Sequence, residues 1–189
     1  MPRYTYKRDS YLSRDEVLDM IEAANEDWLK ALIALLYLYG MRISEALRLT
    51  PNDFSTEYKK WLACRVRLSK KRKTRGPVEP MHILRINYKK ELLRPFILPL
   101  MRHLIDRTKR FPQEPLWVRD RTTIWKKIKQ LNANCSPHFF RHSRLYHLAE
   151  KGATAVVLRD WAGWSDLRPA GSYIQAGGHL AKKYADRIE

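Results

Sequence analysis

Residues 28–40 read WLKALIALLYLYG and are apolar on almost every side of a helical projection. Asp27 precedes this stretch and Gly40 ends it, two residue types favoured at the first and last turns of helices. A helix that is apolar all round is normally buried, because it has no polar face for solvent. The run contains Lys30 and falls short of the roughly 20 residues that a membrane span needs. We therefore expect a buried central helix around which the other elements pack.

Helical patterns lie on both sides of this stretch. Ser13 followed by Glu16 has the spacing of a capping box and predicts a helix over about 13–25. Residues 61–69 and 78–86 carry alternating and β-branched side chains instead, and predict two strands joined by the basic loop KKRKTRG. Further helices are expected over RISEALRL and at about 91–109, 120–131, 138–151 (ended by Gly152), 154–162 and 168–175. The fold class is therefore mainly α with a small antiparallel β-sheet.

The composition points to a polyanionic partner. Among 189 residues, 37 are Lys or Arg and 20 are Asp or Glu, which gives a net charge of +17 and a pI near 10.1. Lys and Arg that neutralise phosphates release condensed counterions, so such a chain favours nucleic acid. The two cysteines, Cys64 and Cys135, form no CxxC pair and fit a reducing, cytoplasmic compartment. The first residues are polar and charged, so we expect no signal peptide, and the nucleotide motifs GxxxxGK[ST] and GxGxxG do not occur.

Three segments carry candidate chemistry: LYLYGMRISEALRLTPNDF with Arg42 and Glu45, SPHFFRHS with His138 and Arg141, and WAGWSDLRPAGSY with Trp164 and Tyr173. Residues three apart on a helix share one face, so the pair in SPHFFRHS can address one ligand. Taken singly, each residue has a commoner explanation: a surface arginine, a packing tyrosine or a core tryptophan. The i, i+4 spacing of His138 and His142 also suits a metal pair, but HExxH and a third ligand are missing from the sequence, so we expect no metal.

In order and spacing, these segments resemble the tyrosine recombinases, the phage integrase family. That family carries an arginine in a G-x-R-x-S-E type segment, a lysine on a β-hairpin, an H-x-x-R pair, a His or Trp after a Gly, and a nucleophilic tyrosine. The matching residues are Arg42, a hairpin lysine, His138 with Arg141, Trp164 and Tyr173. Trp164 lies 23 residues after Arg141, and Tyr173 lies nine after Trp164, as in the family. The likeness runs from about residue 11 to about 175 and implies the tyrosine recombinase catalytic-domain fold.

The resemblance implies a role for each residue. Tyr173 would attack the scissile phosphate, and Arg42 and Arg141 would stabilise the charge on its non-bridging oxygens. His138 would accept or return the tyrosine proton, Trp164 would pack against the nucleophile helix, and Glu45 would orient the network indirectly. The hairpin general acid is expected at Lys70, with Lys73 and Lys71 as alternatives. Neither ATP nor another cofactor is expected. The remaining basic residues of the loop are expected to contact DNA: Lys71, Arg72, Lys73 and Arg75.

The same resemblance also implies how the chain is organised and what its partners are. We expect one catalytic domain over residues 1–189, with an N-terminal arm at 1–12 and a tail at 176–189 that is a candidate for exchange between protomers. The helical core-binding domain that most members carry before this one is not expected within the chain. The expected partners are double-stranded DNA and further copies, as a tetramer on DNA and a monomer without it. The expected location is the cytoplasm, at the nucleoid when the chain is on DNA, and not a membrane. The alternatives are a catalytically silent DNA-binding protein of this fold and a basic RNA-binding protein. Integration of a virus or plasmid, resolution of chromosome dimers and inversion of DNA all use this chemistry, so the sequence does not predict which of them the chain performs.

Overall fold

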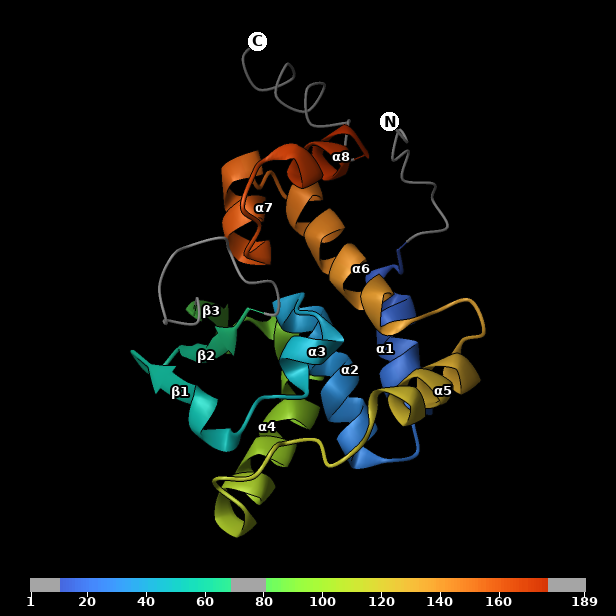
Figure 1. Cartoon of the computed structure of the whole chain (residues 1–189), viewed down its shortest axis with the longest axis vertical. Helices are drawn as coiled ribbons and strands as arrows, with labels where there is room; N and C mark the ends of the chain where they lie inside the picture. The colour runs from blue at the N-terminus through green and yellow to red at the C-terminus, as the bar shows by residue number, and fades with distance from the viewer. Residues whose placement is uncertain (1–10, 69–80, 177–189) are drawn as a thin grey trace.

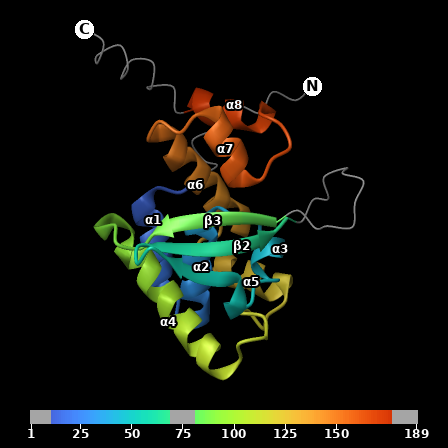
Figure 2. The same ribbon diagram turned by 90° about the vertical axis from the view of Figure 1, so that its left-hand side faces the viewer.

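The computed structural model describes residues 11–68 and 81–176 and has the predicted fold class, helices with one small antiparallel sheet (Figures 1 and 2). Each predicted helix is present within these residues, with ends displaced by up to three residues. The helices are α1 (Arg14–Ala23), α2 (Asp27–Tyr39), α3 (Ile43–Ala46), α4 (Arg94–Arg110), α5 (Arg121–Leu131), α6 (Pro137–Glu150), α7 (Ala155–Ala162) and α8 (Arg168–Ala176), with short 3-10 turns at Pro51–Asp53 and Glu91–Leu93.

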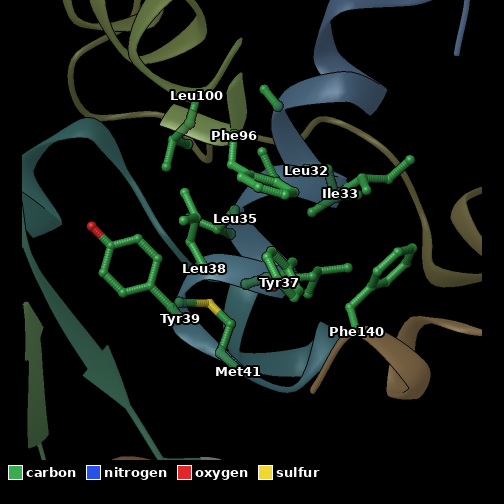
Figure 3. Packing of buried hydrophobic residues seen from close by; sticks show 14 of the residues in the cluster. Leu32, Ile33, Leu35, Tyr37, Leu38, Tyr39, Met41, Phe96, Leu100 and Phe140 are labelled. Atoms are coloured by element: carbon green, nitrogen blue, oxygen red, sulfur yellow. The ribbon is translucent and has the colours of Figure 1, made fainter. Parts of the chain in front are cut away.

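Helix α2 is the buried centre that the sequence predicts. Ten of its side chains are buried, and it packs against α1, α4 and α6. Figure 3 shows Leu32, Leu35 and Leu38 among the aromatic side chains of neighbouring elements, including Phe96 of α4 and Phe140 of α6. The helix ends at Gly40, whose φ of 61° is left-handed. This turn carries the chain directly into Arg42.

The predicted capping box begins α1. The side chain of Ser13 accepts a hydrogen bond from the Glu16 backbone N–H at 3.2 Å, and the Glu16 carboxylate accepts from the Ser13 N–H at 2.6 Å. The backbone N–H of Leu12 donates to Ser143 Oγ on α6 at 2.8 Å. The segment that enters α1 is therefore attached to α6.

The sheet has three strands, in the order β1 (Phe54–Glu57), β2 (Trp61–Arg67) and β3 (Met81–Asn87), and both pairs are antiparallel. The two predicted strands are β2 and β3, and Leu62 faces Ile86 across them. Strand β1 is absent from the sequence prediction, whose first strand begins at Trp61. It is only four residues long, so it shows almost no alternation, and its pairing with β2 defines it. The predicted loop between β2 and β3 lies mainly at 69–80, outside the described residues.

Helices α6, α7 and α8 enclose a second, smaller core that we call the C-terminal cluster (top of Figures 1 and 2). Its buried members are Leu145, Ala149, Leu158, Ala162, Ala170 and Tyr173. The large cluster around α2 is separate from it, although Trp161 packs against both. Within residues 11–68 and 81–176, none of the helices is both long and apolar enough to cross a membrane.

Substituting Gly40 by alanine is expected to lower the free energy of unfolding by about 1–2 kcal/mol, because a side chain at φ 61° is strained. The new Cβ would also lie 3.3 Å from Arg144 Cγ. Gly171→Ala is the matched control: it lies within α8, with no atom within 4 Å of the added Cβ, and helix propensity predicts a gain of up to about 1 kcal/mol. Urea denaturation measures both, and equal effects of the two substitutions would contradict the strain argument.

Candidate active site

Arg141 lies near the start of α6 and is buried, with 4% of its surface exposed. Its Nη1 donates to the Gly40 carbonyl at 2.7 Å and its Nη2 to the Ala162 carbonyl at 2.8 Å. Gly40 caps α2 and Ala162 ends α7, so both carbonyls lie at helix C-termini, where the backbone carries partial negative charge. One guanidinium thus joins three helices, which fixes its position in the site.

Arg42 lies at the N-cap of α3 and is held by Glu45. The Glu45 carboxylate accepts from the Arg42 backbone N–H at 2.7 Å and from Arg42 Nη1 at 2.8 Å. The Glu45 side chain is 2% exposed and that of Arg42 is 20% exposed. The buried carboxylate therefore holds Arg42 in place, while part of the Arg42 side chain remains open to solvent. This is the contact that an orienting role for Glu45 requires; the role itself stays a prediction.

A cavity of about 360 Å³ opens beside Arg42. His138 of α6 shares its wall with Arg42, although 96 positions separate them in the sequence. The pKa of His138 is lowered by burial first and then by the charges of Arg141 and Arg42. Arg121, at the start of α5, also lines the cavity and is not among the residues predicted from the sequence. The cavity suits an anion, because two guanidinium-bearing residues and a histidine converge on it.

Tyr173 of α8 is 2% exposed. Its ring stacks on Trp164, with 5.7 Å between the ring centroids and 27° between the planes, and the Arg141 guanidinium lies 5.7 Å from the Trp164 ring. Trp164 follows Gly163, which ends α7 in the left-handed region at φ 64°. The structure therefore places Arg141, Trp164 and Tyr173 in one continuous stack, and the packing role predicted for Trp164 has the geometry that it needs.

The Tyr173 hydroxyl is hydrogen-bonded to His142, with 2.6 Å between Oη and Nδ1. In the sequence, His142 stands out only as a possible metal partner of His138, one turn earlier on the same helix face. The two imidazole rings meet edge to face at 4.7 Å. Burial first, then the neighbouring His138 and Arg141, lower the pKa of His142 to about 4. His142 is therefore neutral at physiological pH.

A second tyrosine–histidine pair lies one turn further along α6. Tyr37 of α2 and His147 are 3.0 Å apart between Oη and Nδ1. Burial first, then the charges of Arg144, Lys151 and Arg14, lower the pKa of His147 to about 4. This pair resembles the one at Tyr173 but belongs to the packing of α6 on α2.

The two lowered histidine pKa values predict that the protein loses stability in acid. Both fall from 6.5 to about 4 on folding, so between those pH values the unfolded chain binds more protons and the free energy of unfolding decreases as pH falls. By pH 4, protonation of each histidine lowers the free energy of unfolding by on the order of 3 kcal/mol. Urea midpoints measured from pH 7 to pH 4 should fall less steeply for His147→Asn than for the wild type. A slope that this substitution leaves unchanged would contradict the prediction.

The predicted hairpin residues, Lys70, Lys71, Arg72, Lys73 and Arg75, lie outside the described residues. The structure thus brings Arg42 and His138 together at the cavity, and Arg141, Trp164 and Tyr173 in the stack beside it. His142 joins the two groups, since it contacts both His138 and Tyr173. Within residues 11–68 and 81–176, no three His, Cys, Asp or Glu side chains are grouped so as to hold a metal ion.

Residues 10–178 match the sequence profile of the Phage integrase family. Tyrosine recombinase XerD of Staphylococcus saprophyticus is 28% identical over 195 residues, which cover 96% of this chain and 61% of that protein. The chain therefore spans about three fifths of the length of this curated relative.

Two solved structures share the fold at lower identity. The XerH site-specific recombinase, bound to a palindromic difH substrate in a post-cleavage complex, superimposes with a TM-score of 0.70 at 17% identity, over 95% of this chain and 53% of that one. The catalytic domain of bacteriophage HP1 integrase superimposes with a TM-score of 0.63 at 14% identity, over 93% of both chains. Together they identify the helical domain with its three-stranded sheet as a tyrosine recombinase catalytic-domain fold.

Proposed function

Because the chain belongs to the phage integrase family, we propose that it is a site-specific recombinase that cuts and rejoins double-stranded DNA through a covalent bond to Tyr173. One observation carries the proposal: a buried tyrosine lies in a stack with Trp164 and Arg141, next to a cavity that Arg42 and His138 line. Separate parts of the sequence supply these residues, and packing alone does not require them to converge. The XerH relative was solved on its DNA substrate after cleavage, which supports the same reaction here.

The proposed mechanism transfers one phosphodiester bond to the enzyme and back. Tyr173 attacks the scissile phosphate, which leaves a 3′-phosphotyrosyl enzyme and a free 5′ hydroxyl. Arg42 and Arg141 stabilise the negative charge that gathers on the non-bridging oxygens, and Glu45 keeps Arg42 oriented. Lys70, or in its place Lys73 or Lys71, protonates the departing 5′ oxygen. Attack by a second 5′ hydroxyl reverses the steps, and neither metal nor ATP is required, because one ester replaces another.

His138 and Arg141, the two residues of the H-x-x-R pair on α6, differ in how accessible they are from the cavity. His138 faces the cavity, and we propose that it hydrogen-bonds a phosphate oxygen there or takes part in proton transfer. Arg141 lies deeper, and its two backbone hydrogen bonds orient the guanidinium toward Trp164. A phosphate in the cavity would meet Arg42 and His138 directly, whereas the charge of Arg141 acts on His138 from outside the residues that line the cavity.

The DNA interface that we propose combines the basic loop with the outer face of the sheet. Arg65, Arg67 and Arg85 are exposed on β2 and β3, the two strands that the segment with Lys71, Arg72, Lys73 and Arg75 connects in the sequence. The net charge of +17 favours such a surface against phosphates. We propose a tetramer on DNA, with the tail at 176–189 exchanged between protomers, and a location at the nucleoid in the cytoplasm.

The alternative is a silent DNA-binding protein of the same fold, and a nicked suicide substrate separates the two. The nick lets the short 5′ fragment diffuse away after cleavage, so the covalent complex accumulates and migrates slowly on a denaturing gel. A recombinase forms this complex with or without EDTA on at least one of several DNA sequences. Binding that a mobility shift confirms, together with no complex on any sequence, would establish the silent alternative.

A further inference from the structure

We propose that His142 is a catalytic residue whose Nδ1 accepts the phenol proton while Tyr173 attacks phosphorus. The assignment rests on the function proposed above, since it gives that nucleophile its proton acceptor. It differs from the expectation drawn from the sequence, in which His138 accepts this proton. The observation behind it is the distance of 2.6 Å between Tyr173 Oη and His142 Nδ1.

Burial of the tyrosine makes a protein acceptor necessary. Tyr173 is 2% exposed, with Trp164 stacked on its ring and the His142 ring at 5.9 Å and 25° on another side. A phenol with a free pKa near 10 is almost entirely protonated at neutral pH, and bulk water has little access to this hydroxyl. The proton must therefore leave through a group within hydrogen-bond reach, and His142 is such a group.

The surroundings keep His142 in the state that an acceptor needs. The titratable groups against it among the described residues are His138 and Arg141 on α6 and Tyr173 on α8. Burial, His138 and Arg141 lower its pKa to about 4, so the imidazole is neutral and one ring nitrogen carries a lone pair. With the proton on Nε2, Nδ1 accepts the hydrogen bond from Tyr173. A bound phosphate would raise the basicity of this imidazole, because its negative charge offsets the nearby cation.

The proton transfer is coupled to bond formation. A free phenol is a far weaker acid than an imidazolium, so in the resting site the proton stays on oxygen. As the bond from Oη to phosphorus forms and the bond from phosphorus to the 5′ oxygen breaks, Oη becomes strongly acidic and its proton passes to Nδ1. The 5′ oxygen takes its proton from the proposed hairpin lysine. Rejoining returns both protons, so each full cycle leaves the enzyme unchanged.

Two substitutions separate proton transfer from positioning. His142→Phe keeps a ring without an acceptor, whereas His142→Asn offers an amide oxygen near the place of Nδ1 that accepts a hydrogen bond but takes up no proton. We expect both variants to bind nicked DNA normally and to form the covalent complex about 10²–10⁴-fold more slowly. A wild-type rate in His142→Asn would overturn the assignment, since it would show that positioning alone is needed. A folded His142→Phe at the wild-type rate would overturn any role.

The pH profile gives a readout that a structural role would not change. The wild-type cleavage rate should be flat from roughly pH 6 to pH 8, since His142 is neutral throughout. In His142→Asn the rate should rise about tenfold per pH unit over the same range, because hydroxide must remove the phenol proton. If the cleavage rates of the wild type and of His142→Asn changed with pH in the same way, the proposal would be contradicted. The defect should also persist on DNA whose bridging 5′ oxygen is sulfur, a leaving group that needs no proton; rescue there would reassign His142 to the departing oxygen.

A measurement without DNA tests the resting geometry. Nitrogen-15 chemical shifts of labelled histidine at pH 7 should show His142 protonated on Nε2 and hydrogen-bonded at Nδ1, and Tyr173→Phe should move the Nδ1 shift. A proton on Nδ1 would overturn the proposal whatever the activity. If the wild type forms no covalent complex on any nicked DNA, the proposed function itself fails and the inference fails with it. Loss confined to the His142 variants leaves both in place.

Discussion

A Tyr173→Phe chain is expected to bind nicked duplex DNA with wild-type affinity and to form no covalent complex with it. The substitution removes one oxygen and keeps the ring, so the contact with Trp164 remains and the hydrogen bond to His142 is lost. Removing the nucleophile lowers cleavage to background, a loss of about 10⁴-fold or more. The free energy of unfolding should fall by only about 1 kcal/mol.

Tyr37→Phe is the matched control for this result. Tyr37 is also buried, and its hydroxyl also lies within hydrogen-bond distance of a histidine Nδ1 on α6. Its substitution should cost similar stability and leave the covalent complex intact. Denaturing gels and urea midpoints measure the two effects separately. A complex that persists in Tyr173→Phe would show that another residue is the nucleophile.

Arg141→Lys is expected to slow formation of the covalent complex by about 10²–10³-fold. A lysine retains the charge but presents one nitrogen, so it cannot donate to the Gly40 and Ala162 carbonyls in the geometry of the planar guanidinium. Arg141→Ala should in addition lower the free energy of unfolding by about 2–4 kcal/mol, because two carbonyls at helix ends lose their charged donor.

Arg144→Lys serves as the control for Arg141. Arg144 lies three residues later on the same helix, with its guanidinium against the rings of Tyr37 and Trp161. Its substitution should also destabilise the protein, while the cleavage rate stays within about tenfold of the wild type. If the two lysine substitutions slow cleavage equally, the effect of Arg141 is one of stability and its proposed role in charge stabilisation is wrong.

Most of the fold could be predicted from the sequence because its strongest signals are local. An apolar run ended by Gly40 makes a buried helix in almost any context, and a capping box begins α1 through contacts within four residues. Strand β1 could not be predicted, since four residues carry little periodicity and their pairing with β2 decides their conformation. The start of α4 lies three residues later than predicted for a related reason: residues Glu91–Leu93 form a 3-10 turn, which the spacing of apolar residues does not distinguish from an α-helix.

The candidate site could also be predicted only in part from the sequence. The order of Arg42, His138, Arg141, Trp164 and Tyr173 follows from the resemblance, and the structure groups them around one cavity and one stack. The contact of His142 with Tyr173 spans 31 positions and depends on how α8 packs on α6, which the sequence pattern does not encode. The same holds for Arg121, whose place beside the cavity results from the packing of α5. The roles of the loop residues Lys70, Lys71 and Lys73 stay predictions.

The separation of the two cores gives the nucleophile a local stability of its own. Tyr173 belongs to the C-terminal cluster, whereas the elements that position Arg42 pack on the much larger cluster around α2. A small core contributes less free energy against opening, so α7 and α8 can open together without unfolding of the rest. Amide hydrogens there are expected to exchange with solvent through that partial opening, ahead of those in α2. A subglobal folding equilibrium would then govern the fraction of molecules in which the proposed nucleophile is correctly placed, and the proposed DNA and protomer partners could shift it.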